Sequence, residues 1–172
     1  MKRFVYLPVM ILMLLALVMP SSALAMGATQ FSGTAYWPTE GQCVDSVGAG
    51  ADYAVHMTGD LEGCHYTFIE TSVCSPGGGY NETGKEVFVG TLDGQPGTFR
   101  TTYRFTAKLI DCSAAGEIAG RCQHPIVAGS GTGVFEGLTG RLDMRDIVEP
   151  GVGGVAFPYR GHLYPISPSP SG

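Results

Sequence analysis

The sequence has few basic residues, a single tryptophan and almost no helical patterning. Lys and Arg together number 10 of the 172 residues, against 15 Asp and Glu. An acidic chain this poor in lysine does not offer the basic patches that bind a phosphate backbone, so no nucleic-acid partner is expected. The apolar fraction of 44% is too high for an intrinsically disordered chain. With 26 glycines, the composition favours a turn-rich β protein over a helical one.

Signatures of the common hydrolases and metal enzymes are also missing. The sequence has neither a Gly-x-Ser-x-Gly elbow nor a His-Glu-x-x-His motif. The close pair Cys122-x-His124 is not answered by a second pair at C-x-x-C spacing, so neither a metal nor another cofactor is expected. The glycine-rich segment 129–140 contains no lysine and is not a phosphate-binding loop. Its glycines instead permit a tight backbone path, on which Phe135 and Leu138 would plug one end of the fold.

The N-terminus has the pattern of a secretory signal peptide. Lys2 and Arg3 precede an apolar run over residues 4–19, and the small residues that follow predict cleavage after Ala25. The run is marginal for a membrane span, which needs about 20 apolar residues, so no stable membrane insertion is expected after cleavage. The alternative is an uncleaved N-terminal anchor. Cleavage predicts a secreted or periplasmic chain with eight basic and fifteen acidic residues, a net charge of −7.

The rest of the chain is expected to form one domain. Residues 26–164 form a predicted β domain of ordinary single-domain size. Residues 165–172 are a polar, proline-rich tail that is predicted to be disordered. Residues 1–25, the signal peptide, complete the predicted organisation.

Strand patterns fill the predicted domain. Within residues 97–109, apolar side chains alternate with Arg, Thr and Lys, which indicates a long, half-buried strand. Further strands are expected over 30–37, 53–58, 61–71, 80–92, 140–148 and 154–163. A series of about eight strands in sequential hairpins predicts an all-β fold, a single eight-stranded antiparallel barrel, with a sandwich as the alternative. Such a barrel has room inside for side chains or for one small ligand.

Five cysteines remain after cleavage, and disulfides are the expected state of cysteines in an exported chain. Spacing alone does not select among the many pairings. A repeated spacing of ten residues favours Cys64–Cys74 and Cys112–Cys122, each closing one turn, with Cys43 unpaired.

The segment Gly-Ser-Gly-Thr-Gly-Val-Phe-Glu-Gly-Leu-Thr-Gly-Arg-Leu-Asp at 129–143 resembles the glycine-rich turn of the allene oxide cyclase and dirigent barrel superfamily. Residues 98–108 and 157–162 resemble segments of bacterial secreted members of unknown function, so the likeness covers roughly residues 60–164. The resemblance implies an eight-stranded, allene oxide cyclase-like barrel with an apolar cavity, in a homo-oligomer. Members of the superfamily cyclise fatty-acid epoxides, guide phenoxy-radical coupling or fold polyketides in cycloadditions.

Candidate site residues follow from strand alternation. Tyr66, Phe68 and Glu70 share one strand face, and Met144 and Asp146 share another. A carboxylate beside apolar groups shifts toward its neutral form and can act as a general acid or base, although both carboxylates also have structural explanations. The predicted catalytic residues are Glu70, Asp146, Tyr66 and His162, and the predicted cavity-lining residues are Phe68, Phe99, Tyr103, Phe105, Met144 and Tyr159.

Two functions of different classes fit these observations. The first is a cofactor-free cyclase or isomerase that holds an apolar small molecule in a reactive conformation. The second is a non-catalytic secreted barrel: a carrier of an apolar ligand, a dirigent-like guide or a structural protein. A barrel filled completely by Phe99, Tyr103, Phe105 and Phe135 would exclude both a carrier and a cyclase.

Overall fold

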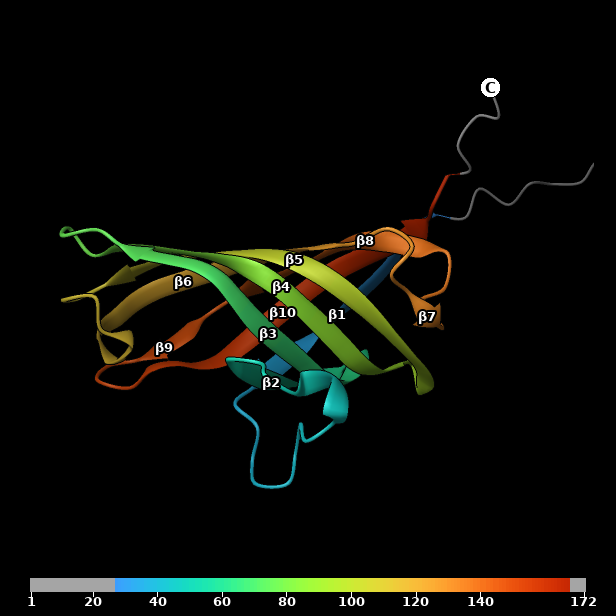
Figure 1. The fold of residues 1–172 in the computed structure, drawn as a ribbon, viewed down its shortest axis with the longest axis horizontal. Coiled ribbons are helices and arrows are strands. Elements are labelled where there is room, and N and C mark those ends of the chain that lie inside the picture. The colour runs from blue at the N-terminus through green and yellow to red at the C-terminus, as the bar shows by residue number, and fades with distance from the viewer. Residues whose placement is uncertain (1–26, 168–172) are drawn as a thin grey trace, which may run out of the picture.

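The computed structural model describes residues 27–167, and nearly all of its regular structure is β (Figure 1). Two short strands, β7 (Thr132–Gly133) and β9 (Ile147–Glu149), lie outside the main ring and pair with β5 (Gln95–Leu109) and β10 (Gly153–Pro165), respectively. Among the described residues there is no helix of sufficient length and apolarity to cross a membrane. The ring consists of β1 (Thr29–Tyr36), β2 (Tyr53–Gly59), β3 (Leu61–Cys74), β4 (Gly79–Leu92), β5 (Gln95–Leu109), β6 (Glu117–Ile126), β8 (Leu138–Arg145) and β10 (Gly153–Pro165), and the remaining elements are β7 (Thr132–Gly133), β9 (Ile147–Glu149) and the 3-10 helices η1 (Ser46–Gly48) and η2 (Ala114–Gly116).

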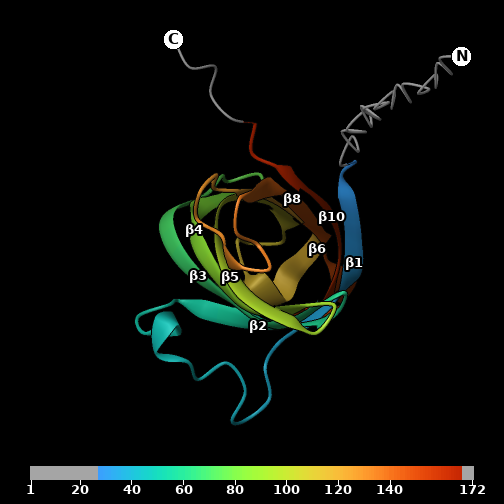
Figure 2. The ribbon, with the colours of Figure 1, turned by 90° about the vertical axis from the view of Figure 1, so that its right-hand side faces the viewer.

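The ring is a closed antiparallel barrel, as the sequence predicts. Neighbouring strands follow the order β1-β2-β3-β4-β5-β6-β8-β10, and β1 pairs with β10 to complete the circle (Figure 2). That last pairing runs from Thr29 opposite Leu163 to Tyr36 opposite Ala156. Closure satisfies the backbone groups that an open sheet would expose at its edges.

One end of the barrel is filled by aromatic side chains. The segment before β8, orange in Figure 2, lies across this end and inserts Phe135, which is only 1% exposed. Its ring centroid lies 4.9 Å from Phe99 and 5.8 Å from Phe88. Gly97 leaves space for the Phe135 ring, because a Cβ at this position would collide with it. Phe135 therefore plugs this end, with Leu138 packed against the same cluster.

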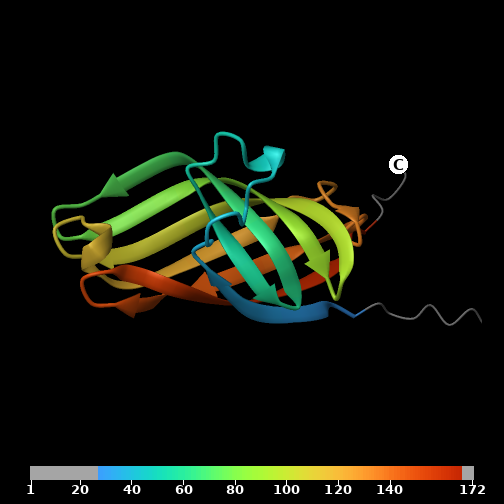
Figure 3. The same ribbon diagram turned by 90° about the horizontal axis from the view of Figure 1, so that it is seen from below.

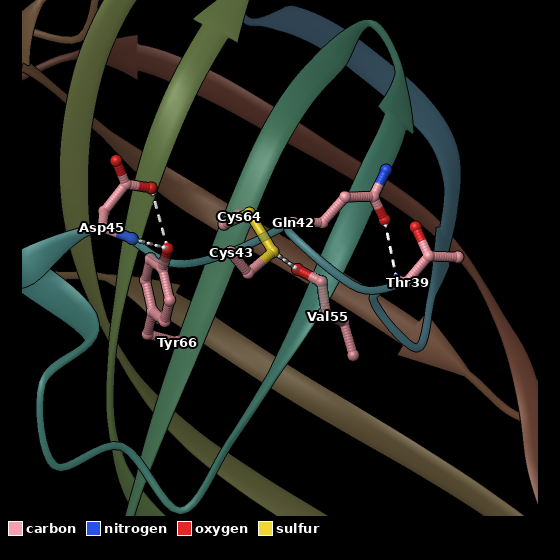
Figure 4. The surroundings of a disulfide bond; sticks show 7 residues. All are labelled: Thr39, Gln42, Cys43, Asp45, Val55, Cys64 and Tyr66. Atoms are coloured by element: carbon pink, nitrogen blue, oxygen red, sulfur yellow. Dashed lines mark hydrogen bonds between the residues drawn. A yellow bond between two sulfur atoms is a disulfide. The ribbon is translucent and has the colours of Figure 1, made fainter.

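The segment 37–52 covers the outer face of β2 and β3 (Figure 3). A disulfide between Cys43 and Cys64 ties it to the barrel, and the Tyr66 hydroxyl donates to Asp45 Oδ2 at 2.8 Å (Figure 4). Gly48 lies directly over the Tyr66 ring, where any side chain would collide. As a result, β3 is buried on both of its faces around Cys64 and Tyr66.

The predicted disulfide pairing is wrong. The bonds are Cys43–Cys64 and Cys74–Cys112, and Cys122 is a buried free thiol. Cys64 and Cys74 lie on the same extended strand, where ten residues span about 33 Å, far beyond the reach of a disulfide. The second bond instead joins the β3–β4 turn to the β5–β6 turn.

Strand β6 is the one ring strand that the sequence patterns did not predict. Its inward-facing positions include Gly120, Cys122 and His124, so the apolar alternation typical of a half-buried strand is absent. At the C-terminus, Pro165 belongs to β10 and the Ile166 N–H donates to Gly137 O at 2.9 Å, so the ordered structure extends past the predicted boundary at 164. The predicted signal peptide and residues 168–172 of the predicted tail lie outside the described residues.

We expect both disulfides to stabilise the fold in proportion to the loops they close. Replacing Cys74 and Cys112 together by Ser, which opens a loop of 38 residues, lowers the unfolding free energy by about 4 kcal/mol on the chain-entropy relation. Replacing Cys43 and Cys64, with a separation of 21 residues, costs about 3 kcal/mol. Denaturant titration measures both changes. Non-reducing peptide mapping that recovered Cys122 in a disulfide would contradict the pairing.

Candidate functional site

A cavity of about 500 Å³ occupies the half of the barrel opposite the Phe135 plug. Its mouth lies between the β5–β6 and β9–β10 turns, at the left in Figure 1, where Ala114 and Val152 line it. The barrel is therefore filled at one end only, and the other end has room for a small ligand. Most of the wall is apolar and is formed by Trp37, Val55, Phe105, Leu109, Met144 and Phe157.

Glu86 lies on the polar floor of this cavity and has partners on three other strands. Its Oε2 lies 2.7 Å from His124 Nδ1 on β6 and accepts a hydrogen bond from the Thr101 hydroxyl on β5 at 2.6 Å. Its Oε1 accepts from the Thr67 hydroxyl on β3 at 3.2 Å. His65 Nε2, also on β3, lies 3.5 Å from Oε2. All five residues are buried, so the carboxylate is solvated by protein groups and not by bulk water.

These partners keep Glu86 ionised. Burial alone would raise its pKa, but the charges of His124 and His65 and the hydrogen bonds from His124 and Thr101 lower the pKa from 4.5 to about 2. Burial also disfavours the charged form of His65 and lowers its pKa from 6.5 to about 4, although Glu86 opposes this change. At neutral pH, Glu86 is therefore a carboxylate and His65 a neutral imidazole.

His124 has one ring nitrogen without a partner. A carboxylate can only accept hydrogen bonds, so His124 Nδ1 carries the proton that joins it to Glu86. Nε2 is buried and has no hydrogen-bond partner among the described residues. His124 lines the cavity, and the Tyr103 ring stacks on it at a centroid distance of 6.3 Å. An imidazole that is oriented by a carboxylate and keeps its second nitrogen unpaired has the arrangement of a general base.

A second buried carboxylate on β4, Glu82, is surrounded by phenols. The hydroxyls of Tyr80, Tyr103 and Tyr53 donate to it at 2.5, 2.8 and 3.3 Å, respectively. Burial and the hydrogen bond to Glu82 raise the pKa of Tyr80 to about 12, so this phenol stays protonated and continues to donate. Gly84 leaves space for the Tyr103 ring, because a Cβ there would collide with it. Glu82, Tyr53 and Tyr80 form a second polar part of the cavity wall.

Asp146 and Glu117 form a carboxyl pair near the mouth. Both line the cavity, and both approach Gly120 so closely that a side chain there would collide with them. Burial, together with the hydrogen bond and the charge of Glu117, raises the pKa of Asp146 from 3.8 to about 8. Glu117 Oε2 accepts from the Gly154 N–H at 3.0 Å, whereas Oε1 is buried and needs the Asp146 proton as its partner. At neutral pH Asp146 therefore keeps its proton.

His65, Glu86 and His124 form the one group of His, Cys, Asp and Glu side chains among the described residues whose spacing suits a metal ion. Their ligand atoms lie within 4.8 Å of one another, and two histidines with one carboxylate suit a divalent transition metal. A metal-bound histidine normally donates its second N–H to an oxygen, but His124 Nε2 has no such partner. The Thr101 hydroxyl already satisfies the Glu86 oxygen that would face the ion. These three side chains are therefore better described as a hydrogen-bonded network than as a metal centre.

The structure places the predicted site residues on both sides of the barrel wall. Asp146, Phe105 and Met144 line the cavity. The rings of Phe99, Tyr103 and Tyr159 lie inside the barrel but are packed into its core cluster.

The prediction that Tyr66, Phe68, Glu70 and His162 face the cavity is wrong. Tyr66 lies beneath the segment 37–52, and Phe68 points to the same outer side of β3. Glu70 is exposed and forms an ion pair with Lys85, and His162 stacks on Tyr164 on the outer face of β10. The predicted inward face of β3 is its outward face because the segment 37–52 buries the outer side of this strand. Apolar residues therefore mark that side, and the polar His65 and Thr67 point inward.

Sequence reasoning also missed the residues of the cavity floor. Glu82 and Glu86 lie on the strand face that carries Phe88 and Leu92, and these two apolar side chains are buried. Extending the same alternation toward the start of the strand places both carboxylates inside the barrel. His65 and His124 carry no comparable signal, since their partners come from other strands. No protein-family model matches the chain, and neither does any curated protein, so the site is interpreted from its own geometry.

The Asp146–Glu117 pair makes stability depend on pH in a defined direction. The pKa of Asp146 is higher in the folded protein than in the unfolded chain. Its contribution to the unfolding free energy is therefore fully present below about pH 3.8 and is lost as the pH rises toward about 8. Asp146→Asn keeps a hydrogen-bond donor for Glu117 but does not titrate. Between about pH 5 and about pH 8, we expect the wild-type unfolding free energy to fall by about 2 kcal/mol relative to this variant, with allowance for solvent near the mouth.

Denaturant titration at both pH values checks this expectation. The comparison cancels the contribution of His65, which titrates in the same range in both proteins. The matched control is Asp143→Asn on the outer face, which should keep the wild-type slope. An identical slope in wild type and Asp146→Asn would contradict the shared proton.

Proposed function

We propose that the protein is an exported barrel that binds an apolar small molecule and isomerises or cyclises it by proton transfer. The observation that carries the proposal is the unpaired Nε2 of His124, oriented by Glu86 on the floor of a largely apolar cavity. Apart from the polar floor and the carboxyl pair, the cavity wall is apolar. It therefore favours an apolar ligand over a charged one.

In the proposed reaction, His124 Nε2 takes a proton from the bound molecule. Glu86 holds the ring in the required tautomer and stabilises the imidazolium that forms, as a carboxylate does for a catalytic histidine. The proton held by Asp146 and Glu117 is available to an oxygen on the substrate, since a pKa near 8 suits proton donation around neutral pH. The proton on His124 then returns to a different atom of the same molecule, and the substrate oxygen gives its proton back to the Asp146–Glu117 pair, so both protein groups recover their starting protonation. An isomerisation or cyclisation of this kind conserves all atoms and electrons, so it requires no redox cofactor.

The carboxylates of this site have the opposed environments that acid–base chemistry uses. Glu86 is held ionised by its hydrogen-bond donors and the neighbouring histidines, whereas Asp146 is kept neutral by burial and a neighbouring carboxylate. The apolar wall excludes water around Glu86 and limits it around Asp146, which strengthens the interaction of both groups with a bound molecule. The resemblance of segment 129–143 to the allene oxide cyclase and dirigent superfamily supports the same class of activity. The two disulfides and the N-terminal pattern support export.

A carrier of an apolar ligand is the second candidate. The apolar wall of the cavity favours it, because binding requires only that wall and the open mouth. A carrier would use Glu86 and His124 to orient its ligand, without proton transfer.

The first test is to identify the ligand by native mass spectrometry of the protein secreted by its own host. That molecule then serves as the substrate for turnover. We expect Glu86→Gln to reduce turnover by roughly 10²–10⁴-fold, because the neutral amide no longer stabilises an imidazolium, while affinity for the ligand changes much less. The matched control is Glu70→Gln, the same change on the outer face, which should keep wild-type turnover.

Circular dichroism and binding of the ligand show whether Glu86→Gln has folded. If it has not, His124→Gln tests the same step by removing the base directly. Wild-type turnover in either folded variant would contradict the proposed mechanism. Ligand binding without turnover in the wild type would favour the carrier.

A further inference from the structure

The basic residues of the described chain lie on one side of the barrel. All eight are on β4, β5, β6, β8 and β10, which are consecutive neighbours in the ring, and all point outward. Two of them, Lys85 and Arg141, are ion-paired with Glu70 and Asp143. The other six are exposed and form no ion pair with a described residue, and we refer to them as the basic face: Arg100, Arg104, Lys108, Arg121, Arg145 and Arg160.

Acidic side chains are almost absent from this side. Asp143 is the only described acidic residue that points outward from these five strands. It is bound to Arg141 at 2.7 Å and lies opposite Arg160. Glu149 lies on the adjoining short strand β9, and the remaining acids face the cavity, occupy turns or belong to the opposite side of the barrel. The overall negative charge therefore conceals a strongly positive surface.

The arrangement of the arginines works against the stability of the sheet. Arg121 on β6 is directly opposite Arg145 on β8, and like charges in this position repel each other. Arg104 and Arg121 line a shallow groove of about 300 Å³ with Thr106 and Gln123, and none of these groups is acidic. Since no carboxylate among the described residues forms an ion pair with Arg121 or Arg145, the arrangement suits anions supplied from outside.

The chemistry of the neighbouring surface indicates which anions. Ile118 and Ile147 are 55% and 52% exposed and line a groove of about 860 Å³ together with Arg121, Arg145 and Arg160. Asp143 and Asp146 also line this groove, so its arginines outnumber its carboxylates without excluding them. Strands lie about 4.8 Å apart, so cations on four strands cover an area and not a line. A guanidinium pairs well with phosphate. Transfer of an exposed isoleucine side chain from water into an apolar layer is favourable.

We propose that the basic face docks the protein on the surface of an anionic lipid bilayer. Phospholipid headgroups supply a planar array of phosphates for the arginines, and the layer beneath accepts Ile118 and Ile147. A linear polyanion such as DNA matches the observations less well, since it provides neither a planar array nor an apolar layer for the isoleucines.

Co-sedimentation with vesicles tests this proposal. The wild type should bind phosphatidylcholine vesicles that contain phosphatidylglycerol, bind pure phosphatidylcholine vesicles weakly, and be released by salt. The double variant Arg121→Gln/Arg145→Gln should partition to the anionic vesicles about thirtyfold less, on about 1 kcal/mol per basic residue. It should be at least as stable as the wild type in a thermal melt, because the change removes a like-charge pair.

The matched control is Gln30→Glu/Gln42→Glu. It changes the net charge by the same amount, at exposed positions on the side of the barrel without basic residues, and should retain most of the binding. Equal binding to both kinds of vesicle, or an equal loss of binding in the two double variants, would overturn the proposal. So would binding to dextran sulfate or duplex DNA without binding to anionic vesicles.

Discussion

The antiparallel pairing of β1 with β10 is the interaction on which the rest of the structure depends. It joins the two ends of the sheet in a single register and removes the last open edge. Once the ring is closed, each strand has an inside and an outside, and alternate residues are committed to one or the other. His65, Glu86 and His124 come from three strands and meet only because closure turns their inner faces toward a common centre. In an open sheet, the same side chains would be separate and hydrated.

The interior is divided between two environments. At the plugged end, Phe88, Phe99 and Phe135 pack against one another and exclude solvent. At the other end, apolar walls surround a floor of ionisable groups whose carboxylates are stabilised by hydrogen bonds from neighbouring side chains. An unpaired charge is costly to bury. Glu86 can be buried because its hydrogen-bond donors replace the water that the carboxylate loses. The aromatic end thus serves as a rigid base against which the polar floor is held in place.

The fold was largely predictable from the sequence, whereas the site was not. Alternation over residues 97–109 identifies β5 directly, and the glycine-rich segment correctly places Phe135 at the end of the barrel. The apolar pattern of β3 predicts the wrong inward face, because the segment 37–52, which is distant in sequence from most of β3, buries the outer face. Strand β6 was overlooked because its inner face is polar. Partners in both disulfides lie more than twenty residues apart, so local spacing does not reveal them.

The free thiol of Cys122 has a consequence for the order in which the chain matures. In the finished barrel, Cys122 is buried and its pKa is raised by burial and by nearby carboxylates, so it is a poor nucleophile toward either disulfide. Before β6 joins the ring, no such protection exists, and Cys122 can capture any of the other four cysteines. Correct oxidation therefore requires the strands to assemble before the last sulfur bond forms, and the barrel acts as the template for its own crosslinks.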